Sequence, residues 1–224
     1  HMFKCKKFTI IYGHYGCGKT NLSLNLALML AREGNPVTLV DLDIVNPYFR
    51  SSDYKGLFEG LDVEVVSPQF AGTNLDLPSL PAEIYSVFNQ AGRYVIMDIG
   101  GDDAGAYALG RFAGQIESLA DYEAYYVVNK YRALTQSPQE AAGMLSEIEA
   151  ASRVKATGII NNSHLQGLTT AEDILASAAY AQRTAAALSL PLVMTTAPKD
   201  VAQELEGKIE GLYPVEVIVR PPFE

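Results

Sequence analysis

The chain has 224 residues, of which 48% are hydrophobic and 19% are charged, and it contains two cysteines. This length suits one α/β domain with a full core, which we predict to span residues 1–224. The formal net charge of −9 and the lack of a basic run exclude proteins that bind nucleic acid through a cationic surface. No apolar stretch is long enough to span a bilayer and no signal peptide is visible, so we expect no membrane partner and a cytoplasmic location.

Short apolar runs alternate with helix-forming stretches along the chain. The runs that predict strands cover residues 8–12, 36–40, 63–66, 94–97, 124–128, 156–160, 192–194 and 215–219. The stretches that predict helices cover residues 21–30, 78–90, 106–119, 138–151 and 171–190. This alternation is typical of βαβ units, so the sequence predicts an α/β fold, doubly wound, with a mostly parallel sheet and helices on both faces. The run at 215–219 stops at two prolines and is expected at an edge of the sheet.

Residues 13–20 read GHYGCGKT and fit the phosphate-binding pattern GxxxxGK[ST] at every fixed position. A predicted strand precedes them and a predicted helix follows, which is the context that the pattern requires. Glycines let such a loop wrap round phosphates, which then bind backbone N–H groups and the helix N-terminus. Lys19 is predicted to reach the β- and γ-phosphates and Thr20 to ligate Mg²⁺. The predicted phosphate-binding residues are Gly13, His14, Tyr15, Gly16, Cys17, Gly18, Lys19, Thr20 and Asn21.

Two predicted strands end in acids, at the edge of an open parallel sheet where ligands bind. Asp43 is predicted to position the attacking water, so that Asp43 and Lys19 form the catalytic pair, while Asp41 supports Mg²⁺. Asp98 closes an apolar run and is the predicted main carboxylate ligand of Mg²⁺, with the Gly101 N–H facing the γ-phosphate. The alternative is that the first segment is a turn rich in Asp and Asn that caps the next helix, and that the second is a turn that ends its strand.

Together these stretches resemble the P-loop ATPases of the MinD/ParA type, in the CobQ/CobB/MinD/ParA group of the SIMIBI class. The resemblance implies ATP or ADP with Mg²⁺ as the cofactor. It also implies that Asn161 or Asn162 reads adenine and that Pro198 covers the other face of the base. The chain departs from the family at His14, where a signature lysine would reach the partner's nucleotide in a face-to-face dimer. A neutral imidazole does not supply that fixed charge, so a homodimer stays open.

Residues 127–132 read VVNKYR and are similar to the guanine-reading pattern NKxD, but position 132 is arginine instead of aspartate. The carboxylate that would pair with the guanine amino group is therefore missing. This departure favours ATP over GTP.

The sequence leaves three functions open. The leading one is a slow ATPase that acts as a nucleotide-dependent switch, or as an assembly or maturation factor for a client protein, with residues 43–50 and 98–103 sensing the γ-phosphate. The second is an ATP-dependent ligase or small-molecule kinase of the dethiobiotin-synthetase-like branch, with a substrate pocket lined by Thr73 and Asn74 or by Tyr107 and Arg111. The third is a nucleotide sensor that does not hydrolyse its ligand.

Overall fold

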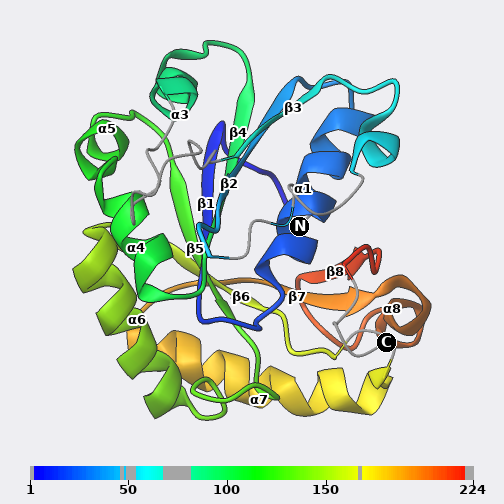
Figure 1. Cartoon of the computed structure of the whole chain (residues 1–224). Helices are drawn as coiled ribbons and strands as arrows, with labels where there is room; N and C mark the ends of the chain where they lie inside the picture. The colour runs from blue at the N-terminus through cyan, green and yellow to red at the C-terminus, as the bar shows by residue number, and fades with distance from the viewer. Residues whose placement is uncertain (1–2, 46–47, 49–53, 68–81, 166–167, 220–224) are drawn as a thin grey trace.

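An eight-stranded sheet forms the centre of the computed structural model, which describes residues 3–45, 48, 54–67, 82–165 and 168–219. The strand order is β3-β2-β4-β1-β5-β6-β7-β8, and every neighbouring pair is parallel (Figure 1). The strands are β1 Phe8–Tyr12, β2 Val37–Leu42, β3 Val63–Val66, β4 Tyr94–Ile99, β5 Glu123–Val128, β6 Gly158–Asn161, β7 Leu192–Pro198 and β8 Leu212–Val215. The predicted doubly wound α/β fold is confirmed.

Helices cover both faces of this sheet, with α1 on one side and α4, α6 and α7 on the other (Figure 1). The helices are α1 Lys19–Arg32, α3 Ala82–Ser86, α4 Asp103–Gly110, α5 Ala113–Glu117, α6 Pro138–Ser152, α7 Ala171–Leu188 and α8 Lys199–Leu205. Two 3₁₀ turns are η1 Lys55–Phe58 and η2 Val87–Asn89. Within the described residues, every helix is too short or too polar to serve as a membrane span.

Strand β1 shows why the apolar runs are continuous. Ile10 and Tyr12 belong to the core beneath α4, α6 and α7, whereas Ile11 belongs to the core beneath α1. Successive side chains of a strand point to opposite faces, and here both faces are covered. All residues of β1 and β2 are therefore buried.

Two predicted helices differ from the observed ones. The helix predicted at 78–90 is described only from Ala82, as the short helix α3 followed by η2. The helix predicted at 106–119 is broken into α4 and α5 after Gly110. At Gly110 a Cβ atom would lie 2.9 Å from the Ala151 oxygen of α6, and the next turn places the Phe112 ring 5.7 Å from the Phe88 ring. These tertiary contacts override the helical pattern.

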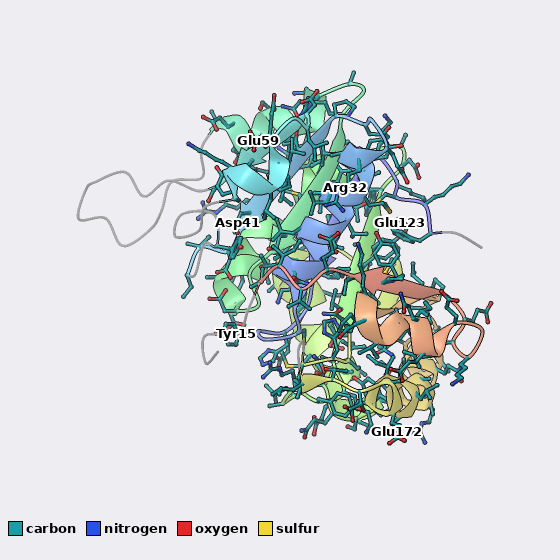
Figure 2. The ribbon with its side chains drawn as sticks, turned by 90° about the vertical axis from the view of Figure 1, so that its right-hand side faces the viewer. Tyr15, Arg32, Asp41, Glu59, Glu123 and Glu172 are labelled. Atoms are coloured by element: carbon teal, nitrogen blue, oxygen red, sulfur yellow. The ribbon has the colours of Figure 1, made fainter. Side chains whose placement is uncertain are left out.

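The last predicted strand is also displaced. An edge strand is present, but β8 ends at Val215, and residues 216–219 instead cross α1 (Figure 2). We call residues 216–219 the C-terminal strap. Asn25 and the Glu216 backbone exchange two hydrogen bonds of 2.8 and 2.9 Å, and the Asn21 Oδ1 accepts from the N–H groups of Ile218 and Val219. The strap therefore pairs with asparagine side chains and not with a strand.

Candidate functional site

The loop between β1 and α1 needs its glycines for two separate reasons. Gly16 and Gly18 have φ angles of 83° and 81°, in the left-handed region that favours glycine. At Gly13 a Cβ atom would lie 2.6 Å from the Val127 oxygen, so only glycine permits this approach to β5. Gly18 is the N-cap residue of α1 and has no side chain with which to cap it. The first N–H groups of α1 are thus available to an anion.

Lys19 lies at the centre of this loop and is only 7% exposed. Its Nζ donates a 3.0 Å hydrogen bond to the His14 carbonyl oxygen. A Cβ atom at Gly101 would lie 2.8 Å from the same Nζ, and the Gly101 oxygen accepts a 3.1 Å hydrogen bond from the Tyr15 N–H. The Tyr15 side chain itself lies at the surface, 64% exposed (Figure 2). The structure therefore brings the lysine and the glycine after β4 together at the loop.

The predicted metal ligands also meet. The Thr20 hydroxyl donates a 2.7 Å hydrogen bond to Asp98 Oδ2, and Asp41 is the register partner of Asp98 on the neighbouring strand. Asp98 Oδ1 is buried and has no hydrogen-bond partner among the described residues. Burial raises the pKa of Asp98 to about 6, although the Thr20 hydrogen bond and the Lys19 charge act in the opposite direction. Asp43 follows closely, since its N–H donates a 2.9 Å hydrogen bond to Asp41 Oδ1.

This arrangement suits Mg²⁺ that is shared with a phosphate better than a metal ion whose ligands all come from the protein. Among the described residues there is no group of three or more His, Cys, Asp or Glu side chains that would hold a metal ion. Mg²⁺ in phosphate sites is commonly held by one or two carboxylates and takes its other ligands from phosphates and water. The unpaired Asp98 oxygen beside the Thr20 hydroxyl matches that requirement.

The two asparagines after β6 have different surroundings. Asn162 Nδ2 donates a 2.7 Å hydrogen bond to the Cys17 oxygen of the phosphate loop, and its Oδ1 accepts from the Thr196 hydroxyl and from His164 Nε2. Asn161 is fully buried and its Nδ2 donates instead to Ser177 of α7. The structure thus places Asn162, but not Asn161, against the loop.

Two further predicted residues occupy other positions. Pro198 ends β7 and is the N-cap residue of α8. The Asn21 side chain is committed to the C-terminal strap, so only its backbone N–H remains for a phosphate. The sequence offered no local sign of this, because the partners of Asn21 lie nearly the whole chain away.

A cavity of about 340 Å³ lies beside the first half of the loop. Neither Lys19, Thr20 nor Asp98 lines it, so it is separate from the predicted metal ligands. His14 and Glu147 line it together, and His14 Nδ1 is buried with no hydrogen-bond partner among the described residues. Burial and the Lys19 charge lower the pKa of His14, against the opposite effect of Glu147. Burial and Lys19 therefore both favour the neutral form of the His14 imidazole.

The pocket residues proposed from the sequence are not those that line this cavity. Tyr107 and Arg111 are exposed and do not line it, and Thr73 and Asn74 lie outside the described residues. Glu147, on α6, was missed because nothing in the helical pattern distinguishes it from a surface acid. Arg132 was considered only as a departure from a base-reading pattern, yet its Cδ would lie 3.9 Å from a Cβ at Gly16.

Comparison with known proteins agrees with this geometry. Residues 8–169 match the model of the CobQ/CobB/MinD/ParA nucleotide binding domain. No curated protein sequence matches the chain.

Solved structures show the same fold at low sequence identity. FtsY from Mycoplasma mycoides has a TM-score of 0.59 and 15% identity over 88% of this chain and 62% of its own. FtsY from Thermotoga maritima has a TM-score of 0.54 and 21% identity over 88% of this chain and 63% of its own. FlhF complexed with GTP and Mg²⁺ has a TM-score of 0.57 and 12% identity over 88% of this chain and 68% of its own. The chain thus spans less than two thirds of the FtsY chains. By its match to the family model over residues 8–169, this chain belongs to the CobQ/CobB/MinD/ParA nucleotide-binding family.

Proposed function

We propose that this protein binds ATP with Mg²⁺, hydrolyses it slowly and uses the nucleotide state to control a client protein. The observation that carries the proposal is the meeting of Thr20 with Asp98 beside Lys19, at the N-terminus of α1. A hydroxyl, a buried carboxylate with an unpaired oxygen and a lysine are the groups that a triphosphate with its metal requires. The client is implied by the family resemblance alone.

The phosphates would be held mainly by the backbone. The N–H groups at the start of α1 face an incoming anion, and Lys19 would exchange its bond with the His14 carbonyl for the β- and γ-phosphates. Thr20 and Asp98 would hold Mg²⁺, with Asp41 supporting it. When bound, the metal supplies positive charge that offsets the charge of the phosphates.

Asp43 is the proposed water-positioning residue. Its backbone is fixed by Asp41, and a Cβ at Gly100 would lie 3.3 Å from Asp43 Oδ1. The carboxylate therefore lies against the loop that carries Gly101, on the side expected for the terminal phosphate. Loss of that phosphate would change contacts in both loops at once, which is how such proteins signal their nucleotide state.

For the base, we propose a preference for adenine with Asn162 as the contact. One amide hydrogen of Asn162 Nδ2 bonds to Cys17, and the second would donate to a ring nitrogen of a purine. The chain lacks the aspartate that would pair with a guanine amino group. Since FlhF was solved with GTP, the direct check is to compare the affinities of the protein for ATP and GTP.

The experiment that tests the proposal is Mg·ATP turnover per molecule over a wide range of protein concentration, together with an ATP affinity measurement. We expect Asp43→Asn to keep the affinity and lose the turnover, and the exposed control Glu172→Gln to change neither. A rate per molecule that rises with protein concentration would indicate a homodimer. Tight binding without turnover would favour the nucleotide sensor, and absence of any nucleotide binding would refute the proposal.

The cavity beside His14 supports a second candidate, the ligase or small-molecule kinase. Its volume of about 340 Å³ lies within the usual range of ligand pockets, and it adjoins Gly101 next to the expected γ-phosphate. This function requires turnover that depends on a second substrate. Ala106→Leu, which fills the cavity, would then abolish that dependence and leave ATP affinity unchanged.

A further inference from the structure

The phosphate loop lacks a fixed positive charge at position 14. The His14 imidazole is half-buried beside Lys19, and both effects lower its pKa. Lys19 is then the cation that the loop itself brings to a triphosphate carrying several negative charges. Another positive group close to the loop would therefore have a large effect on phosphate binding.

Arg132 lies on a firmly held turn next to this loop. The turn follows β5, and the buried Asn129 organises it. Asn129 Oδ1 accepts a 2.9 Å hydrogen bond from the Tyr131 N–H, and the Asn129 backbone oxygen accepts from the Arg132 N–H at 3.2 Å and from the Thr135 hydroxyl at 2.7 Å. The backbone position of Arg132 is thus fixed, although its side chain is exposed.

The side chain lies close to Gly16 of the loop. A Cβ at Gly16 would lie 3.9 Å from Arg132 Cδ, which is ordinary contact distance. The Arg132 charge also reaches the next loop residue: burial raises the pKa of the Cys17 thiol, and Lys19 and Arg132 act against that rise. The guanidinium makes no hydrogen bond or ion pair with any described residue, whereas Arg93 is held by Asp62 and by two atoms of β2.

We infer that Arg132 binds the phosphates of the nucleotide from the outer side of the loop, at Gly16. It supplies within one chain a charge that the family otherwise takes from a lysine at position 14. The inference rests on the proposed nucleotide binding but not on hydrolysis. A guanidinium suits this role because its planar fork donates two parallel hydrogen bonds to phosphate oxygens and it stays charged at any physiological pH.

The test is the affinity of the full chain for ATP and ADP, each with Mg²⁺, in three variants. We expect Arg132→Ala to weaken ATP binding about tenfold and ADP binding less, because the triphosphate carries more charge. Arg132→Lys should recover part of the loss. The matched control is Arg183→Ala, which removes the same charge at an exposed position of α7.

Salt dependence gives a second readout. Removing one phosphate contact should reduce the slope of the logarithm of ATP affinity against the logarithm of salt concentration in Arg132→Ala but not in Arg183→Ala. Equal ATP affinities of wild type and Arg132→Ala, with binding still lost in Lys19→Ala, would overturn the inference and leave the proposed function standing. A wild-type chain that binds neither ATP nor GTP would overturn both.

Discussion

The proposed phosphate side and the proposed base side of the site are formed by different kinds of groups. The phosphate side depends on backbone conformation: left-handed glycines, a helix N-terminus and a second glycine loop after β4. The region proposed for the base depends on buried polar side chains, in which Asn161 and Asn162 bond to groups on α7, β7 and the loop. A site made of backbone leaves a short local pattern in the sequence, whereas a side-chain network leaves none.

The largest expected effect is the loss of nucleotide affinity on removing Lys19 from the phosphate side. Lys19→Ala should reduce affinity for a nucleoside triphosphate by roughly a hundredfold or more, because it removes a buried charged contact to the phosphates. Isothermal titration with Mg·ATP measures this. Lys155→Ala, at an 85% exposed side chain on the surface, is the control. Retained affinity in Lys19→Ala would move the phosphate site away from residues 13–20.

A pair of glycine variants separates backbone strain from close packing. Gly18 and Gly34 have φ angles of 81° and 89°, so alanine is strained equally at both. A Cβ at Gly34 meets nothing within 4 Å, whereas one at Gly18 would lie 2.5 Å from Asn162 Nδ2. We expect Gly34→Ala to lower the free energy of unfolding by about 1 kcal/mol and Gly18→Ala by about 3 kcal/mol. Urea unfolding measures both free energies. Equal decreases in the two variants would show that the Asn162 amide moves aside at no cost.

Variants of Asn161 and Asn162 test whether the region proposed for the base is coupled to the phosphate loop. Asn162→Ala removes the bond to Cys17 and should weaken nucleotide binding about tenfold while lowering stability by about 2 kcal/mol. Asn161→Ala should lower stability by a similar amount and leave the affinity within about twofold of wild type, because Asn161 bonds to α7 and not to the loop. If both variants lost affinity alike, the distinction between them would be wrong.

The smallest expected effect is a pH dependence. Burial lowers the pKa of His164 to about 4, so the folded protein keeps this ring neutral where the unfolded chain takes up a proton. The unfolded state then binds more protons between about pH 4 and 6.5, and stability falls as the pH falls through that window. This group should contribute a loss of about 1.5 kcal/mol between pH 6.5 and 5. Unfolding of His164→Gln at both pH values should show a change smaller by that amount, and an identical change would exclude His164 as the source.

Local patterns predicted the central features well. The central strands β1, β4 and β5 were recognised because both faces of the sheet are covered there, which makes their sequences largely apolar, whereas the last strand was placed too late in the chain. The glycine pattern located the loop within one residue of the start of α1. Contacts between distant segments were not predictable. The break after Gly110 depends on α6 and on Phe88, and the role of Asn21 depends on residues at the other end of the chain.

The C-terminal strap has a consequence for the order in which the molecule folds. Asn21 and Asn25 are hydrogen-bonded to strap residues that follow them in the sequence by 191 to 198 positions. Contacts of such separation pay a large loop-closure entropy and form late, after the sheet between them exists. During synthesis the phosphate loop and α1 emerge before the strap, while the side-chain amides of Asn21 and Asn25 are still solvated. The hydrogen bonds of these two amides form only after residues 216–219 have been added. Maturation of the nucleotide site should therefore follow the synthesis of residues 216–219 and not the appearance of its own motif.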